Sequence, residues 1–319
     1  RRQRVSRPAG GIGVANVGHT HPEVVAAIES QARAYLHCAV YGEMAEAPQV
    51  ELARRLAEVT PGALSTVFFT NSGAEAIEGA LKTARKYTGR RRFVAFDGAF
   101  HGDTFGAMSV GGNPYYKEPF EPLLPGVEHL PFNTEVGALL VFDEVLTGFG
   151  RTGKLFAAEH WGVEPDLLVL AKALGGGMPL GAFIGRPEVM ATLSHDPPLA
   201  HVTTFGGHPV SCAAGLAALE FSLRNDLAAR AERLGSAWRL ELQALCGNVL
   251  REVRGMGLLI GLEFASPEAT QRFAQHCLAN RLILNWTLHR DTVVRLVPPL
   301  TIEDDEIGQA MQIFRAGLT

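Results

Sequence analysis

Apolar and polar positions follow two alternating spacings through the first two thirds of the chain. Apolar side chains recur every three or four positions, as on one face of a helix, in residues 21–36, 48–60 and 71–89. Short apolar runs that are typical of buried strands lie at 65–70, 91–96, 138–145, 166–171 and 181–185. This alternation predicts an α/β fold in which a mostly parallel central sheet has helices on both faces.

The pattern changes near residue 210. Helical spacing covers residues 211 to about 246, and short strands at 258–264 and 293–300 then flank another helix. This texture predicts a smaller α+β domain at the C-terminal end. We therefore expect three parts, namely an N-terminal segment that belongs to the small domain, 1–40, a large domain, 41–220, and the small C-terminal domain, 221–319.

The composition is that of an ordinary globular protein, with 47% hydrophobic and 19% charged residues in a chain of 319. The net charge is -4 and the basic residues are scattered outside 89–92, which argues against a nucleic-acid partner. The longest uncharged stretch, 197–219, is broken by glycine, histidine and proline, and the first residues lack the apolar core of a signal peptide. We expect neither nucleic acid nor a membrane as a partner.

The four cysteines have neither the spacing of a metal site nor the density of a disulfide scaffold. They are far apart in the sequence, at Cys38, Cys212, Cys246 and Cys277. Free thiols are typical of a reducing compartment. We therefore expect a cytoplasmic protein without a metal centre.

A predicted strand–turn–helix junction carries small residues where its helix begins. Ser72, Gly73 and Ala74 would let backbone N–H groups approach an anion, and the helix dipole would add attraction. A plain helix cap is the alternative explanation, because many Asn-Ser-Gly turns only cap. The loop 201–209 has hydroxyls and glycines that could bind a second phosphate oxygen, although the same string is common in ordinary loops.

Two reactive side chains follow predicted strands. Asp143 ends the apolar run at 138–142, where a carboxylate could hold a cationic ring nitrogen; an N-cap or an ion pair with Arg151 is the alternative. Lys172 follows the apolar run at 166–171, and apolar surroundings leave a neutral amine able to form an imine with an aldehyde. A structural lysine with its head group in solvent is the commoner fate of such a residue.

These signals are more informative together than singly. An anion site, a strand-end carboxylate and an imine-forming lysine are the contacts that pyridoxal 5′-phosphate requires for its phosphate, ring nitrogen and aldehyde. A covalent use of Lys172 would explain why a lysine lies in an apolar run. The sequence therefore predicts a pyridoxal-phosphate site.

The segment 143–185 resembles the signature of the class III pyridoxal-phosphate aminotransferases, which have fold type I. Further blocks are similar to the family in the family's own order and extend the resemblance over nearly the whole chain: GVANVGHTHPEVVAAI, TNSGAEAIEGALKTARKYTG, GAFHGDTFGAMSVGG, VTTFGGHPVSCAAGLAALE and VVRLVPPLTI. The resemblance implies a fold type I transferase that moves an amino group from a small-molecule donor to an oxo acid.

The resemblance also implies roles for particular residues. Lys172 would form the Schiff base and carry protons, and Asp143 would hold the pyridinium nitrogen. Thr204 would reach the phosphate bound by a neighbouring subunit, which implies a homodimer with shared sites, or a tetramer built from it. Arg295 would pair with a substrate carboxylate. The remaining cofactor contacts would come from Ser72, Gly73, Ala74, Phe100, His101 and Val145.

One departure from the family concerns a missing segment. Only residues 134–136 join the predicted strand at 129–133 to the one that begins at 137, where the family has a long segment with a Glu-Pro-x-Gln-Gly motif that supplies a wall of the active site. Either the chain has lost this segment or the printed sequence omits it. A crossover between neighbouring parallel strands needs a dozen or more residues, which favours omission.

Two further departures concern substrates and the cofactor ring. Asp103 stands where members acting on acetylornithine, ornithine or 4-aminobutyrate usually have an arginine, so a second substrate carboxylate would be repelled. Leu146 stands where many members have a glutamine beside the 3-hydroxyl of the cofactor.

We therefore predict an ω-aminotransferase that passes a terminal amine to an oxo acid such as 2-oxoglutarate or pyruvate by ping-pong kinetics. An aminomutase of the glutamate-1-semialdehyde type is one alternative. A catalytically silent aminotransferase-like fold that binds a ligand is another, although a scaffold has no physical need for Lys172, Asp143 and Thr204 together.

Overall fold

The computed structural model describes residues 12–39, 44–132, 137–287 and 290–318, and the chain divides into two compact units. Unit 1 comprises Arg1–His21, Thr147–Ala157 and Leu219–Thr319, and unit 2 comprises Pro22–Leu146 and Ala158–Ala218. The division into parts at residues 40 and 220 stays a prediction.

Unit 2 contains the predicted central sheet. Four strands lie in the order β1 (Thr66–Thr70), β6 (Gly181–Gly185), β5 (Leu167–Leu170) and β4 (Val141–Asp143). β6 is antiparallel to both of its neighbours and β4 is parallel to β5, so β1, β5 and β4 run in one direction. The expected mostly parallel sheet of an α/β fold is confirmed, with β6 as the reversed strand.

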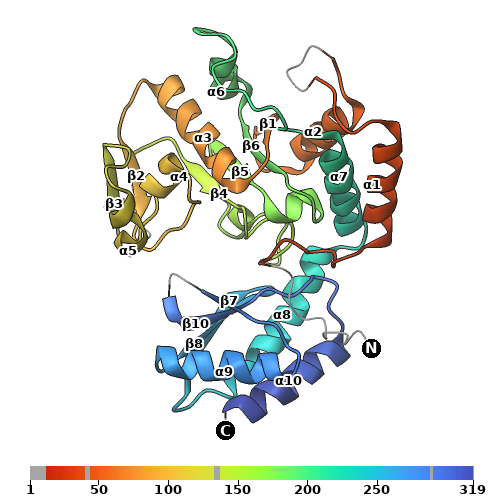
Figure 1. Cartoon of the computed structure of the whole chain (residues 1–319), viewed down its shortest axis with the longest axis vertical. Helices are drawn as coiled ribbons and strands as arrows, with labels where there is room; N and C mark the ends of the chain where they lie inside the picture. The colour runs from red at the N-terminus through yellow and green to blue at the C-terminus, as the bar shows by residue number, and fades with distance from the viewer. Residues whose placement is uncertain (1–11, 40–43, 133–136, 288–289, 319) are drawn as a thin grey trace. The chain divides into compact units, whose positions relative to one another are not determined.

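Helix α3 (Gly73–Thr88) packs on this sheet and forms the core of unit 2 (Figure 1). Ser72 caps its start, and Gly89 ends it in the left-handed conformation at φ 67°, so both ends fall close to where the sequence predicts them. The buried face of α3 packs with the sheet residues Leu167, Val169 and Phe183. The other regular helices of the unit, with α7 continuing into unit 1, are α1 (Pro22–Ala34), α2 (Ala47–Val59), α4 (Phe105–Ser109), α5 (Pro114–Lys117), α6 (Pro187–Met190) and α7 (Pro209–Arg224).

A second, small sheet in unit 2 consists of the parallel strands β2 (Phe93–Phe96) and β3 (Val127–Leu130). Within the described residues, neither strand pairs with the four-stranded sheet. β3 and β4 are consecutive in the chain but are not neighbours in a sheet. This is what a short link requires, because it cannot cross from one parallel strand to the next.

Unit 1 is the expected small α+β domain. Its antiparallel sheet has the order β7 (Leu250–Met256), β8 (Leu259–Phe264), β10 (Arg290–Leu296) and β9 (Asn285–Thr287). The helices α8 (Leu227–Gln243), α9 (Pro267–Ala279) and α10 (Asp304–Leu318) belong to the same unit. Aromatic contacts join β8, α9 and α10, with ring centroids 4.9 Å apart for Phe264 and Phe273 and 5.4 Å apart for Phe273 and Phe314.

All four cysteines are free thiols. Cys212 and Cys277 are buried, and burial raises the pKa of both thiols, that of Cys277 to about 12. Among the described helices, none combines the length and the apolar composition needed to cross a membrane.

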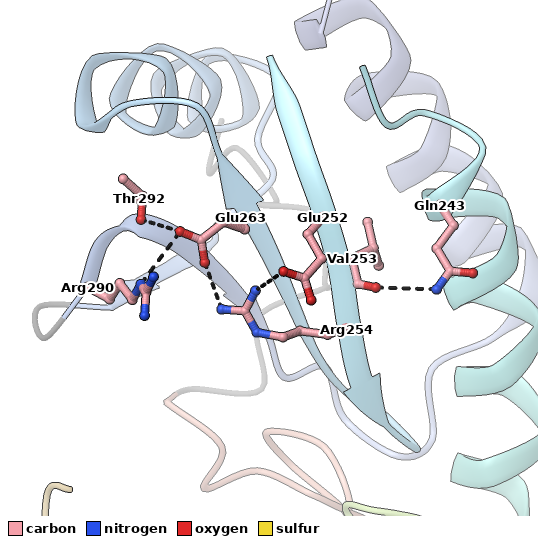
Figure 2. Close-up of polar contacts among 7 residues, drawn as sticks. All are labelled: Gln243, Glu252, Val253, Arg254, Glu263, Arg290 and Thr292. Atoms are coloured by element: carbon pink, nitrogen blue, oxygen red, sulfur yellow. Dashed lines mark hydrogen bonds and ion pairs between the residues drawn. The ribbon is translucent and has the colours of Figure 1, made fainter. Parts of the chain in front are cut away.

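A polar network joins three strands of the small sheet (Figure 2). The Glu263 carboxylate accepts hydrogen bonds from Arg254 Nη2 at 2.7 Å and from Thr292 Oγ1 at 2.6 Å. Arg254 also donates to Glu252 at 3.1 Å, and Arg290 Nε lies 3.6 Å from Glu263. The carboxylate of Glu263 therefore links β7, β8 and β10.

We predict that the charge of Glu263 stabilises unit 1 at neutral pH. Burial by itself raises the pKa of Glu263, but hydrogen bonds from Thr292 and Arg254, together with the neighbouring arginine charges, outweigh burial and leave the pKa below its ordinary value of 4.5. Glu263→Gln should cost about 1–2 kcal/mol above pH 4.5, and this difference from the wild type should vanish as the pH falls through the lowered pKa. Urea unfolding between pH 3 and pH 8 measures it.

Glu241→Gln is the matched control for this measurement. Its carboxylate lies 4.0 Å from Arg315, and both side chains are more than half exposed, so its removal should change stability little at any pH. Equal effects of the two substitutions would contradict the role given to Glu263.

Candidate functional site

The candidate site of unit 2 gathers at the carboxyl ends of strands. Asp143 is the last residue of β4, and its register partner on β5 is Val169. Lys172 follows three residues after Val169, and the turn that starts α3 follows directly after β1. Ligand sites of α/β sheets lie at this edge, so the fold brings the predicted carboxylate, amine and helix start to one region.

Asp143 is held by two hydrogen bonds. Nδ1 of His101 lies 2.7 Å from Oδ2, and the backbone N–H of Val145 donates to Oδ1 at 3.0 Å. Because an ionised carboxylate only accepts hydrogen bonds, the Nδ1 of His101 carries the proton in this contact. The two side chains keep 17% and 24% of their surface exposed, so this pair is sheltered but reachable by a ligand. Arg151, which the sequence offers as an alternative partner for Asp143, belongs to unit 1 and donates hydrogen bonds to other groups there.

Lys172 lies two residues beyond the end of β5. All four residues of β5 are fully buried, whereas Lys172 is half-buried and begins a short 3-10 helix, Lys172–Gly175. Its φ of 46° is in the left-handed region, which costs a non-glycine residue about 1–2 kcal/mol. Gly176, at φ 61°, allows the turn to pass α7, because a Cβ there would lie 2.7 Å from the carbonyl oxygen of Ala214. The surrounding packing thus holds the lysine in a strained backbone conformation.

The start of α3 fits an anion. Ser72 Oγ accepts a hydrogen bond from the N–H of Glu75 at 3.2 Å. The amides of Gly73 and Ala74 lie in the first turn and therefore have no acceptor inside the helix. A Cβ on Gly73 would lie 3.1 Å from both methyl groups of Val145, so only a glycine keeps the backbone open at this point. The dipole of this 16-residue helix adds attraction for a negative group.

The loop after residue 200 is tied to the same region. Asn71 Nδ2 donates to Thr203 Oγ1 at 2.9 Å and to Glu75 at 2.8 Å. Nε2 of His37 lies 2.8 Å from the carbonyl oxygen of Thr204, which orients the backbone of this residue. Thr204 itself is exposed.

Three further positions named from the sequence are near His101 or Asp143 in the chain. Phe100 exposes 50% of its surface, and Asp103 is exposed as well. Leu146 is half-buried and follows Val145 beyond the end of β4. Each of these positions lies within three residues of His101 or Asp143 in the sequence.

Arg295 belongs to unit 1. It lies on β10, half-buried, and burial lowers the pKa of its guanidinium. Its Nε is buried and has no hydrogen-bond partner within the described part of the chain. A sheltered guanidinium of this kind is suited to an anionic ligand.

Arg151 is a buried cation that the sequence suggested only as a partner for Asp143. Its guanidinium donates to Asn16 Oδ1 at 2.6 Å and to the carbonyl oxygens of Leu258 and Pro298 at 3.1 and 2.5 Å. Burial, followed by the charge of Arg295, lowers the pKa of Arg151 to about 9, so it remains charged at neutral pH. Arg151 therefore organises the part of unit 1 that contains Arg295.

The sequence did not reveal the contacts that hold the site together. The pairs His101–Asp143, Asn71–Thr203 and His37–Thr204 are separated by 42, 132 and 167 positions. The only available signal was that each polar residue lies beside a predicted strand end or loop.

The chain matches one family over nearly its whole length. The sequence profile of the family "Aminotransferase class-III" matches residues 7–137 and 133–318. The chain belongs to the class III aminotransferases.

Solved structures support this membership. A thermostable (S)-enantioselective omega-transaminase from Thermomicrobium roseum is 29% identical, with a TM-score of 0.91 over 98% of this chain and 88% of that one. An ornithine aminotransferase from Toxoplasma gondii is 29% identical, with a TM-score of 0.88 over 97% and 85%. A pyridoxal-phosphate-bound amine transaminase from an uncultivated Pseudomonas species is 27% identical, with a TM-score of 0.89 over 98% and 90%.

The predicted fold type I architecture, the transaminase activity and the use of pyridoxal phosphate are therefore correct. The residues of unit 2 fit this cofactor. The open amides at the start of α3 suit a phosphate, the Asp143 carboxylate suits a protonated ring nitrogen, and Lys172 supplies an amine.

We predict that Gly181→Ala weakens cofactor binding by this aminotransferase. A Cβ at residue 181 would lie 2.3 Å from the carbonyl oxygen of Ser72 and 2.5 Å from Thr70 Oγ1, so the start of α3 would have to move. We expect a loss of about 1–3 kcal/mol of stability together with a lower cofactor affinity. Thermal unfolding and titration with pyridoxal phosphate measure the two effects.

Gly308→Ala is the control, because a Cβ at this position in α10 meets nothing within 4 Å. It should leave cofactor affinity unchanged and raise helix stability by up to about 1 kcal/mol. Wild-type affinity in Gly181→Ala would show that the helix start is not part of the cofactor site.

Proposed function

We propose that this aminotransferase takes the terminal amine of a small donor and passes the amino group to an oxo acid such as 2-oxoglutarate or pyruvate. The two half-reactions alternate at one site, which gives ping-pong kinetics. Support comes from relatives at 27–29% identity, whose names include an omega-transaminase, an amine transaminase and an ornithine aminotransferase. The observation that carries the proposal is the strand-end grouping of Asp143, held by His101, with Lys172.

In this proposal Lys172 does the chemical work of proton transfer. Its Nζ would hold the cofactor through the aldehyde that pyridoxal phosphate supplies, and the same amine would accept and return protons as a general base and acid. The strained φ of 46° and the fully buried strand before it fix the backbone from which this side chain extends. A base whose backbone is held in place is favourably positioned for proton transfer.

Asp143 keeps the proton on the ring nitrogen of the cofactor. When bound, pyridoxal phosphate supplies an electron-withdrawing pyridinium ring and an aldehyde that accepts the amino group. The hydrogen bond between His101 Nδ1 and one oxygen of Asp143 orients the carboxylate. An oriented anion is what holds a ring nitrogen in its protonated form.

The other contacts position the cofactor. The amides of Gly73 and Ala74, with the Ser72 hydroxyl beside them, would bind the phosphate. Phe100, which exposes half of its surface, would cover one ring face, and Val145 would pack on the other.

We also propose a homodimer with shared sites. Thr204 is an exposed residue on a loop, and its backbone carbonyl is in contact with His37. A hydroxyl at this exposed position is suited to the phosphate bound by a second copy. The free thiols agree with a cytoplasmic location, which we propose as well.

Arg295 would bind the carboxylate of the oxo acid. Its guanidinium is sheltered, and its Nε has no partner among the described residues, so a carboxylate would supply a missing acceptor. Asp103 near the candidate cofactor site would repel a second carboxylate. We therefore favour donors that carry no acid beside the reacting amine, such as diamines and simple ω-amines.

The direct test is absorption spectroscopy with single donors. The purified protein reconstituted with pyridoxal phosphate should show the band of the lysine-bound cofactor, and an amine donor should convert this band to that of the pyridoxamine form. Lys172→Ala should lose both the band and turnover, because no other residue of the proposal supplies the amine. Lys154→Ala, at an exposed lysine, is the control and should keep both.

A Lys172→Ala protein that transaminates at the wild-type rate would remove Lys172 from its role. A wild-type protein whose cofactor band is unchanged by diamines and other ω-amines but is converted by α-amino acids would contradict the proposed donor class.

We predict that Arg295→Met separates acceptor binding from chemistry. Loss of a charged hydrogen-bond donor should raise the KM for 2-oxoglutarate or pyruvate by about 10–100-fold, with a smaller change in kcat for the donor half-reaction. Steady-state kinetics with each substrate varied in turn measures the split. Arg290→Met, which changes a largely exposed arginine of the same strand, should leave both constants near the wild type. Equal KM values for Arg295→Met and the wild type would place the carboxylate elsewhere.

A further inference from the structure

Strand β10 carries Arg295 close to the point where its pairing with β8 ends (Figure 1). Arg295 is opposite Gly261 in the register of these two antiparallel strands. The same register, continued by three positions, sets Leu258 opposite Pro298. Proline has no N–H group to donate, so Pro298 cannot continue the pairing in full.

Arg151 binds the backbone at both of these positions. Its Nη1 donates to the carbonyl oxygens of Leu258 and Pro298 at 3.1 and 2.5 Å, and the N–H of Leu258 donates to the carbonyl oxygen of Arg151 at 3.0 Å. Its Nη2 donates to Oδ1 of Asn16 at 2.6 Å. Arg151 therefore replaces the missing donor at the end of the sheet and fixes the backbone three residues beyond Arg295.

The acceptors that hold Arg151 are all uncharged. Within the described part of the chain they are one side-chain amide and two backbone carbonyls, although Arg151 is fully buried. A buried cation is better compensated by an ionised partner, because uncharged groups replace only part of its lost hydration. The residues that position Arg151 therefore leave its charge without a counter-charge.

A second guanidinium lies within electrostatic range of Arg151. Burial, and after it the charge of Arg295, lowers the pKa of Arg151 to about 9. Burial also lowers the pKa of Arg295, whose Nε is buried and has no partner among the described residues. These two sheltered cations repel each other, so an anion that binds at Arg295 would be attracted by both.

This attraction depends on the charge of the acceptor molecule. A carboxylate at Arg295 would be stabilised by both guanidinium groups, whereas an uncharged aldehyde or ketone would be stabilised little by either. The contribution of Arg151 needs no direct contact, since Coulomb attraction acts over several ångströms in a site from which most water is excluded.

We propose that Arg151 is a positioning residue that makes this aminotransferase select oxo acids over uncharged acceptors. It fixes the end of the strand that carries Arg295, and its charge attracts the carboxylate that Arg295 binds. This inference rests on the proposed acceptor site at Arg295 and adds a second determinant of its specificity. Asn16 leaves the charge of Arg151 uncompensated, because its amide oxygen lies where a carboxylate would form an ion pair.

The selection is measured with the cofactor-loaded full chain and two acceptors, pyruvate and its uncharged amide, pyruvamide. The measured quantity is the ratio of kcat/KM for pyruvate to kcat/KM for pyruvamide. In ping-pong kinetics each kcat/KM reports on the acceptor half-reaction alone, so one amine donor serves for every variant. Arg151→Gln removes the charge and should lower this ratio about tenfold.

Asn16→Asp separates the charge of Arg151 from its packing. The variant keeps every donor of Arg151 and adds a negative charge at the oxygen that accepts from Nη2, with the loss of the hydrogen bond from Asn16 Nδ2 to the carbonyl oxygen of Phe149. The ratio should again fall about tenfold, because the added charge cancels that of Arg151. If Arg151 had only a structural role, the ratio would stay unchanged, since the ion pair would hold Arg151 at least as firmly.

Arg230→Gln is the matched control for lost packing. Arg230 also donates to backbone carbonyls beyond β10, at Leu300 and Ile302, but its charge is paired with Glu303 at 3.3 Å. Its replacement should lower the temperature of thermal unfolding and leave the ratio near that of the wild type. An equal fall of the ratio in Arg230→Gln and Arg151→Gln would overturn the inference.

Arg295→Met distinguishes a failure of this inference from a failure of the proposed function. It should lower the ratio about 10–100-fold, because the direct partner of the carboxylate is lost. An unchanged ratio in Arg295→Met would overturn the acceptor site itself and this inference with it. A ratio that falls in Arg295→Met but keeps its wild-type value in Asn16→Asp would overturn the role of Arg151 alone.

Discussion

The close approach of helix α3 to strand β6 places the helix start on which the site depends. Gly79 lies in the middle of α3, where a Cβ would come within 2.2 Å of the ring of Phe183. A glycine inside a helix costs about 1 kcal/mol relative to alanine, and here this cost is offset by the burial of a whole phenylalanine against the helix backbone. The open amides of Gly73 and Ala74 stand six and five residues before this contact, so the packing holds the helix start at the end of β1.

Most of the fold could be predicted because the spacing of apolar residues differs clearly between the helices and the strands. The strand at 181–185 and the buried face of α3 match the sequence pattern closely. β7 was missed because its outward side chains are charged, including Arg251, Glu252 and Arg254, and it shows no apolar run. β4 covers only Val141–Asp143, whereas the apolar run that predicts it begins at residue 138.

The chemical residues of the site were easier to predict than the contacts between them. A carboxylate or a lysine after an apolar strand is visible in a single line of sequence, as for Asp143 and Lys172. Contacts such as that of His101 with Asp143 depend on how two distant loops fold, and no local pattern encodes them. The left-handed backbone of Lys172 was also invisible, because strain at a non-glycine residue comes from tertiary packing rather than from local preference.

The guanidinium of Arg151 has a consequence for the order in which the protein matures. Its acceptors lie at residue 16, at Leu258 and at Pro298, so they leave the ribosome at the beginning, late and near the end of synthesis of these residues. A buried cation without its acceptors is strongly unfavourable, so the N-terminal part of unit 1 cannot reach its final packing until the last strands have been made. Unit 2 consists of residues 22–146 and 158–218, all of which precede Leu258 and Pro298 in the chain. The residues around Asn16 are therefore fixed in their final packing only after Leu258 and Pro298, which follow them in the chain by more than 240 positions.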